Sequence, residues 1–188
     1  FLSEGNAGSC DGGTVGAALT VAANKAVPRE KYFTYQAADT IPLSAISGGW
    51  EGTAVTIPGW VYITAEEALV ENIKNALYRH PVSASYTVYE DFSYYRGGVY
   101  EHVWGEDRGG HAILIVGWND ELECWICKNS WGPNWGEEGY FRIKWGECGM
   151  GSYMPYIYST VTQNNPVSLS HAALDLTLES GQTRQAII

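Results

Sequence analysis

The stretch that decides the fold reads Gly109-Gly110-His111-Ala112-Ile113-Leu114-Ile115-Val116-Gly117-Trp118. The apolar run after its histidine is typical of a buried strand, and a second strand is predicted shortly afterwards at Cys124–Lys128. Asn129 follows that second strand directly, eighteen residues after His111 (129 − 111). Neighbouring strands would bring an imidazole and a carboxamide together, a pairing that suits nucleophilic catalysis.

The remaining elements predict an α+β fold, with helices first and an antiparallel sheet second. One helix is predicted from Thr14 to Lys25. Another begins at Thr64, where Thr64 and Glu67 form a capping box, and Pro81 prevents its continuation. Strand signals separated by Gly, Asn and Pro residues then cover Val82–Val88, Ala112–Trp118, Cys124–Lys128 and Tyr140–Trp145.

The composition narrows the functional class. The formal net charge of −10 argues against nucleic-acid binding, which needs a concentrated basic surface. The sequence has no apolar run near the roughly 18 residues that a membrane span needs. Cys124 and Cys127 lie three residues apart in a predicted strand and should point to opposite faces, and a Cys-x-x-Cys zinc or redox site lacks a second ligand pair. We therefore expect neither a metal nor a cofactor.

The histidine and asparagine segments resemble those of papain-like cysteine peptidases. Most of the resemblance lies in the run from Asn129 to Tyr140, which is long and residue-specific. Ser9–Gly13, Cys148-Gly149 and Val88–Tyr100 are also similar to family segments, and the last of these is closest to the cathepsin B branch. The resemblance covers about residues 1–158. It implies a papain-like two-domain α+β fold, with a partial helical domain and an antiparallel, β-barrel-like domain.

The resemblance also implies roles for individual residues. His111 would be the catalytic imidazole that activates a thiol and protonates the leaving amine, and Asn129 would orient that ring. Trp131 would cover the contact between them. The implied substrate-binding residues are Gly12 and Gly13, which would pair with the peptide backbone, and the pocket residues Ser85, Gly110 and Tyr153. Taken without the resemblance, an isolated histidine before a strand is usually structural, and Trp131 and Trp135 are ordinary core aromatics.

The family's nucleophile segment, a helix start resembling Cys-Gly-Ser-Cys-Trp, does not occur in these 188 residues. Cys10 stands before a predicted helix, a position that lowers a thiol pKa. However, it precedes His111 by 101 residues (111 − 10), whereas papain-type enzymes have about 130–150. We therefore expect Cys10 to be half of a structural disulfide, with its partner in a missing N-terminal segment, and this chain alone to be inactive.

The predicted domain organisation has four parts. Residues 1–63 are the remnant of the helical domain with its Gly-Gly substrate loop, and residues 64–158 contain a helix and the β domain with His111 and Asn129. Residues 159–170 form a polar linker. Residues 171–188, with apolar residues alternating from Leu174 to Leu178, resemble the first strands of an immunoglobulin-like sandwich and are too short to fold alone.

These expectations describe the C-terminal part of a cysteine endopeptidase that cuts peptides and proteins through an acyl-thioester. The paired-histidine loop with which cathepsin B trims dipeptides has no counterpart between Gln36 and Thr64, which favours an endopeptidase. The expected compartment is extracellular, or lysosome- or vacuole-like, with secretion favoured. The alternatives are a catalytically silent papain-like protein that binds peptides or glycans, and a transglutaminase-like enzyme, which the Asn-Ser-Trp-Gly run does not suit. We interpret His80, His102 and His171 as surface or turn residues.

Overall fold

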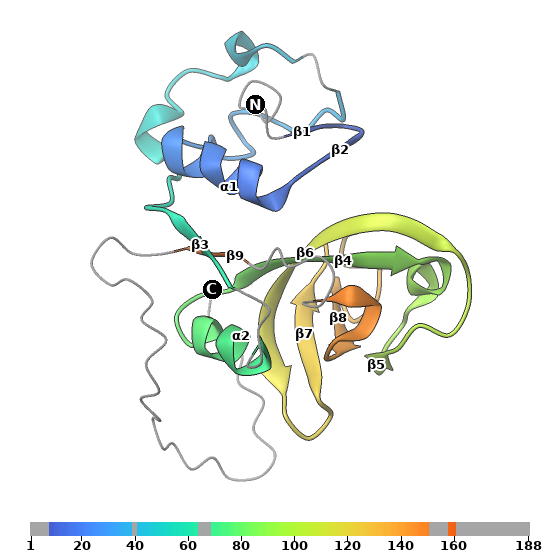
Figure 1. Ribbon diagram of the computed structural model, residues 1–188. Helices are drawn as coiled ribbons and strands as arrows, with labels where there is room; N and C mark the ends of the chain where they lie inside the picture. The colour runs from blue at the N-terminus through green and yellow to red at the C-terminus, as the bar shows by residue number, and fades with distance from the viewer. Residues whose placement is uncertain (1–7, 39–40, 64–68, 151–157, 161–188) are drawn as a thin grey trace. The chain divides into compact units, whose positions relative to one another are not determined.

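Figure 1 shows the computed structural model of the chain. The structure describes residues 8–38, 41–63, 69–150 and 158–160. These residues fall into two compact units: the first contains the described residues up to Val61 together with Thr160, and the second contains those from Tyr62 to Ser159. Each unit is considered by itself below.

The first unit is built around one helix, α1 (Val15–Asn24), which confirms the helix predicted from the sequence. Its N-cap is Thr14, whose Oγ1 accepts a hydrogen bond from the Ala17 amide at 3.3 Å. Only Gly16 and Val21 of this helix are buried, because the described part of the unit supplies no second α-helix to cover the rest of its apolar face. The other elements are the hairpin strands β1 (Gly8–Ser9) and β2 (Gly12–Gly13) and the 3-10 helices η1 (Leu43–Ala45) and η2 (Glu51–Thr53).

The second unit is a mainly antiparallel sheet (Figure 1). The strand order of the whole sheet is β3-β9-β4-β6-β7-β8-β5. The pairs β4–β6, β6–β7 and β7–β8 are antiparallel, whereas the short β5 runs parallel to β8. The strands are β4 (Val82–Tyr89), β5 (Val99–Tyr100), β6 (Asp107–Asn119), β7 (Cys124–Lys128), β8 (Tyr140–Lys144) and β9 (Tyr158–Thr160), and β3 (Trp60–Tyr62) spans the boundary of the two units.

One helix, α2 (Leu69–Leu77), packs against β4 and β6. Its buried residues Ile73, Ala76 and Leu77 follow the helical spacing that the sequence predicts. Thr64 and Glu67, the predicted capping box, lie outside the described residues. The arrangement confirms the predicted α+β class, and none of the helices in the described part of the chain is long and apolar enough to cross a bilayer.

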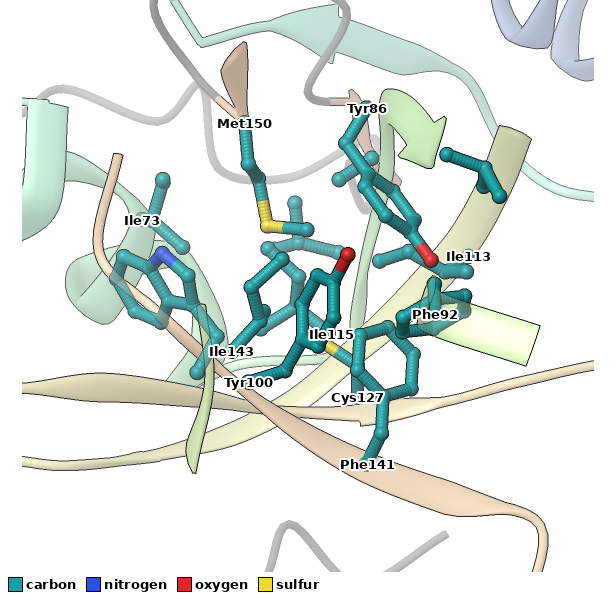
Figure 2. Close-up of a cluster of buried hydrophobic side chains, with 14 of the residues drawn as sticks. Ile73, Tyr86, Phe92, Tyr100, Ile113, Ile115, Cys127, Phe141, Ile143 and Met150 are labelled. Atoms are coloured by element: carbon teal, nitrogen blue, oxygen red, sulfur yellow. The ribbon is translucent and has the colours of Figure 1, made fainter. Parts of the chain in front are cut away.

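The core of this unit is one cluster of buried side chains, most of them from the strands of the sheet (Figure 2). Strand β4 alternates buried and partly exposed residues along its whole length, which places every second side chain in the core. Each fully buried large apolar side chain contributes about 1.5–3 kcal/mol relative to exposure. The 3-10 helices η3 (Glu90–Tyr94) and η4 (Glu147–Gly149) add Phe92 and the partly buried Cys148 to the same cluster.

Strand β6 is longer than the sequence predicts. It begins at Asp107 rather than at Ala112, so His111 lies within the strand and not before it. The cause is tertiary, because pairing with β4 continues from Ile115 back to Asp107 through a bulge near Thr87. The backbone of His111, in the middle of a paired strand, is therefore held in place by the neighbouring strand.

Candidate active site

His111 occupies a central position in β6, where it is paired directly with Tyr86 of β4. Directly paired residues of antiparallel strands project from the same face of a sheet. The imidazole is therefore directed to the same face as the buried Tyr86 and Ile113, and it remains partly exposed. The structure thus gives His111 a rigid backbone support and access to solvent.

Asn129 stands directly after β7, and a turn fixes its backbone. Its amide donates to the Gly139 carbonyl at 2.9 Å. Gly139 has φ +90, and a Cβ there would lie 3.2 Å from the Gly132 carbonyl oxygen. The glycines of the Asn-Ser-Trp-Gly run therefore allow the turn to close tightly over the end of β7. The carboxamide of Asn129 is buried as a result, with 8% of the residue exposed.

The two side chains meet, since Asn129 Oδ1 lies 2.9 Å from His111 Nε2. The same oxygen accepts a hydrogen bond from the Ser130 amide at 2.8 Å. A flipped carboxamide would set two donors against each other at Ser130, so this bond assigns the oxygen of Asn129 to the side that faces His111. Because an oxygen can only accept, His111 Nε2 carries a proton and Nδ1 is the nitrogen left for proton transfer.

Trp131 contacts the imidazole with its indole ring, at 5.1 Å between ring centroids. It is 40% exposed, and its ring also contacts Phe92 at 5.4 Å and Trp135 at 5.0 Å. Trp135 is buried and donates to the Ser93 carbonyl. Trp135 is therefore a core residue, whereas Trp131 lies between the core and solvent beside His111.

The predicted substrate residues are distributed over both units. Ser85 is paired with Ala112 and Gly110 with Thr87, so Ser85 and Gly110 share one face of the sheet. Gly12 and Gly13 form strand β2 of the first unit, and Cys10 is exposed in the turn before them. Tyr153 lies outside the described residues. Their roles in binding a peptide, and the disulfide of Cys10, remain predictions.

A buried carboxylate in η3, Asp91, was not singled out from the sequence. Asp91 Oδ1 accepts hydrogen bonds from the Tyr100 hydroxyl at 2.5 Å and from His102 Nδ1 at 3.1 Å, and Oδ2 accepts from the Val103 and Trp104 amides at 2.8 and 3.2 Å. Burial acts to raise the pKa of Asp91, but these hydrogen bonds together outweigh it and lower the pKa to about 2. The carboxylate therefore stays ionised and ties the β5–β6 connection to η3.

His102 lies in that connection, as expected of a turn residue, but it is not an ordinary surface side chain. Its ring stacks on Tyr89 at 3.8 Å between centroids in addition to contacting Asp91. His171 lies outside the described residues.

The cysteines of the second unit are buried or partly buried. Burial raises the pKa of the Cys127 thiol well above its ordinary value, and burial followed by the Glu147 charge raises the pKa of Cys148 to about 12. Thiols of this kind are poor nucleophiles at neutral pH. No group of three or more potential metal-ligating side chains occurs within the described ranges.

Comparison with known proteins identifies the family of the chain. Residues 3–172 match the sequence model of the family described as papain family cysteine protease. The chain belongs to the papain family of cysteine proteases. The match contains the His111 and Asn129 segments and extends through the region predicted to be a linker, and it confirms the resemblance seen in the motifs.

Relatives of the cathepsin B type are prominent among the similar proteins. A cathepsin B-like protein of Giardia intestinalis, CP3, is 52% identical over 75 residues, which is 37% of this chain and 25% of the relative. The procathepsin B S9 of Trypanosoma congolense has a similar structure, with a TM-score of 0.68 and 25% identity over 82% of this chain and 55% of that one. The Carica candamarcensis cysteine protease CMS1MS2 aligns with a TM-score of 0.63 and 26% identity, covering 80% of this chain and 69% of that one. These structures confirm the papain-like fold. The stretch aligned with the Giardia relative spans only a quarter of that relative's length.

Proposed function

We propose that this chain supplies the histidine and asparagine of a cysteine endopeptidase that cleaves peptide bonds through an acyl-thioester. The observation that carries the proposal is the His111–Asn129 hydrogen bond, whose polarity the Ser130 amide fixes. It leaves Nδ1 of His111 as the proton-transferring atom. Family membership supports the choice of a thiol as the nucleophile.

In this mechanism the thiolate attacks the carbonyl carbon of the scissile bond, and His111 gives its Nδ1 proton to the leaving amine as the C–N bond breaks. The neutral ring then takes a proton from a water molecule, which attacks the thioester carbonyl; the C–S bond breaks, the carboxylic acid is released, and the thiolate–imidazolium pair is restored. Asn129 accepts from Nε2–H in both charge states of the ring. An uncharged partner suits an imidazole that already carries a charge in the thiolate–imidazolium pair.

We propose that the attacking cysteine lies outside these 188 residues. Cys10 is exposed in a hairpin turn of the first unit, and its Cys-Asp-Gly-Gly context suits a substrate loop better than a nucleophile. On this basis the isolated chain does not hydrolyse peptides, and the missing segment of the same protein is its first partner. Thiol-dependent turnover of a fluorogenic peptide by the isolated chain, abolished by Cys10→Ala, would refute this assignment.

The substrate is proposed to be an internal peptide bond of a peptide or protein. The sequence from Gln36 to Thr64 lacks a pair of histidines that could bind a substrate's C-terminal carboxylate. The test compares cleavage of a peptide blocked at its C-terminus with cleavage of the same peptide bearing a free carboxylate. A strong preference for removing two residues from the free C-terminus would make the enzyme a carboxydipeptidase instead.

The compartment is proposed to be extracellular or lysosome-like. The cathepsin-type membership supports this assignment, because such proteases work in those compartments. Immunolocalisation of the full-length protein tests it, and a nuclear or cytosolic signal would oppose it.

The central experiment uses the full-length protein with a fluorogenic peptide under reducing conditions. His111→Ala should reduce kcat/KM by about 10³-fold or more, because it removes the group that moves the proton. Lys128→Ala is the matched control, since Lys128 is exposed at the end of β7 next to Asn129 and leaves the imidazole in place. A full-length protein that binds peptides but shows no thiol-dependent cleavage would instead be a catalytically silent binding protein.

A further inference from the structure

The imidazole of His111 has aromatic neighbours on two sides. Trp131 contacts it from the solvent side, at 5.1 Å between centroids. Tyr86 contacts it from the core side, at 6.0 Å and an interplanar angle of 63°. Tyr86 is also the residue paired with His111 across the two strands, so the contact follows from the register of the sheet. Unlike Trp131, Tyr86 is wholly buried, which makes it the less mobile of the two neighbours.

Tyr86 and Trp131 are supported by the same residue. Phe92 of η3 contacts the Tyr86 ring at 5.5 Å and the Trp131 ring at 5.4 Å, both edge to face. The contacts from His111 to Trp131, Phe92, Tyr86 and back to His111 form a closed circuit, which we call the aromatic frame. Figure 2 shows Tyr86 and Phe92 within the buried cluster. Rotation of the imidazole about its side-chain bonds would meet one member of the frame on either side.

The hydroxyl of Tyr86 plays no part in this frame. It points into the apolar cluster, where it has no hydrogen-bond partner among the described residues (Figure 2). A buried hydroxyl without a partner is unfavourable, so it gives no reason for a tyrosine at this position. The contribution of Tyr86 to His111 must therefore come from its ring.

We infer that Tyr86 is a positioning residue for His111, whose ring acts with Phe92 and Trp131 to fix the rotation of the imidazole. The inference rests on the proposed function of His111. Asn129 fixes one end of the imidazole through Nε2, and the frame fixes the plane of the ring about that hydrogen bond. Nδ1 is then aimed in one direction before substrate arrives, which is where precise orientation contributes to rate.

The structural test needs no catalysis. In the 188-residue chain labelled with ¹⁵N-histidine, the Nε2 proton of His111 should give a resonance protected from exchange by the bond to Asn129. Tyr86→Leu should lose this protection, because the ring is free to turn away, whereas Tyr86→Phe should retain it. Ile113→Val is the matched control, since Ile113 is buried on the same face of β6 and does not belong to the frame.

The kinetic test uses the full-length protein. Tyr86→Leu should lower kcat about 10- to 100-fold relative to wild type with KM nearly unchanged. Tyr86→Phe keeps the ring and should therefore retain the wild-type kcat. Equal behaviour of Tyr86→Leu and Ile113→Val in both measurements overturns the inference. Loss of kcat in Tyr86→Phe also overturns it, because the hydroxyl would then be the functional group.

Two further results keep the test decisive. If Tyr86→Leu does not fold, Tyr86→Met replaces it in both tests. Independently of any variant, the wild-type chain must show a nuclear Overhauser effect between the Tyr86 and His111 ring protons. Its absence contradicts the frame. If His111→Ala leaves hydrolysis intact, the proposed function fails, whereas the protection of the Nε2 proton still reports on the frame alone.

Discussion

Asn129 and Trp131 contact the same imidazole from different directions, although only Ser130 separates them in the chain. Asn129 Oδ1 bonds to His111 Nε2 at 2.9 Å, and the Trp131 ring lies against the imidazole at 5.1 Å. Asn129 is buried while Trp131 is 40% exposed. From this arrangement we predict that the indole keeps water from the Asn129–His111 hydrogen bond.

Because they serve one contact, substitutions of these two residues should not act independently. In the full-length protein, Asn129→Ala should lower kcat/KM about 10- to 100-fold and leave measurable turnover, because His111 still moves the proton. Trp131→Ala should also lower kcat/KM, because water would then reach the Asn129–His111 hydrogen bond and weaken it. Expressed as transition-state free energy from kcat/KM, the loss in the double variant should be smaller than the sum of the two single losses by about 0.5 kcal/mol or more.

A double-mutant cycle on kcat/KM measures this coupling. Its control pairs Asn129→Ala with Lys128→Ala, for which simple additivity is expected. Additive losses for Asn129 and Trp131 would show that Trp131 does not shield the hydrogen bond and is an ordinary groove or core residue.

The Asp91 cluster predicts a specific dependence of stability on acid. The pKa of Asp91 is about 2 in the folded chain and 3.8 in an unfolded reference, so its contribution to stability is fully present above pH 3.8 and is lost as the pH falls through 2. The shift corresponds to roughly 2 kcal/mol at neutral pH. Asp91→Asn should remove at least this amount at pH 7, because an amide cannot accept hydrogen bonds at both of its terminal atoms.

Urea unfolding at pH 7 and at pH 3 checks this prediction. The difference between wild type and Asp91→Asn should shrink by about half at pH 3. Asp120→Asn serves as the control, since Asp120 is 66% exposed and its pairing with Lys74 contributes at most about 1 kcal/mol. An equal loss at both pH values would mean that the charge of Asp91 is not what stabilises the connection.

The sequence predicted four of the strands, β4, β6, β7 and β8, and the meeting of His111 with Asn129, because these features follow from local patterns. Alternation along Val82–Tyr89 and apolar runs in the next two strands mark which segments form the sheet, and adjacent antiparallel strands then align Lys128 with Leu114. Asn129, one residue further on, faces the segment that contains His111. No knowledge of distant parts of the chain was needed for this step.

The Asp91 cluster and the length of β6 could not be predicted in this way. Glu90-Asp91 looks like a polar turn, and its burial depends on the β5–β6 connection, which places His102, Val103 and Trp104 around the carboxylate. Strand β5 has only two residues and pairs in parallel with the distant β8, so its sequence carries no periodic signal. Both features arise from tertiary contacts.

Two buried tyrosines should respond in opposite ways to loss of the hydroxyl. Tyr86→Phe removes a hydroxyl with no partner among the described residues and should leave stability unchanged or raise it by up to about 1 kcal/mol. Tyr100→Phe removes the donor to Asp91 Oδ1 and should destabilise the fold by about 1–3 kcal/mol. Each variant is the other's control in urea unfolding. A comparable loss in Tyr86→Phe would show that its hydroxyl does bind a partner.

The glycines of the Asn-Ser-Trp-Gly run should differ from other glycines in their tolerance of alanine. Gly136 has φ +58, and a Cβ there would lie 2.6 Å from the Tyr140 carbonyl oxygen, a backbone atom that cannot move aside without disturbing the start of β8. Gly146 also has a positive φ, +77, but a Cβ there would meet nothing within 4 Å. Gly146→Ala should therefore cost only the backbone strain, about 1–2 kcal/mol. Gly136→Ala should cost about 1–3 kcal/mol more through the clash.

The two variants separate a packing requirement from a backbone requirement. Gly136 adjoins Trp135, whose ring contacts Trp131, so its displacement should also reach the imidazole. In the full-length protein Gly136→Ala should reduce kcat at temperatures where it remains folded, whereas Gly146→Ala should keep wild-type kcat. Thermal unfolding and kcat measured on the same samples test both parts. Equal stability and equal kcat for the two variants would mean that the turn after Trp135 adapts to a side chain and does not fix the aromatic residues beside His111.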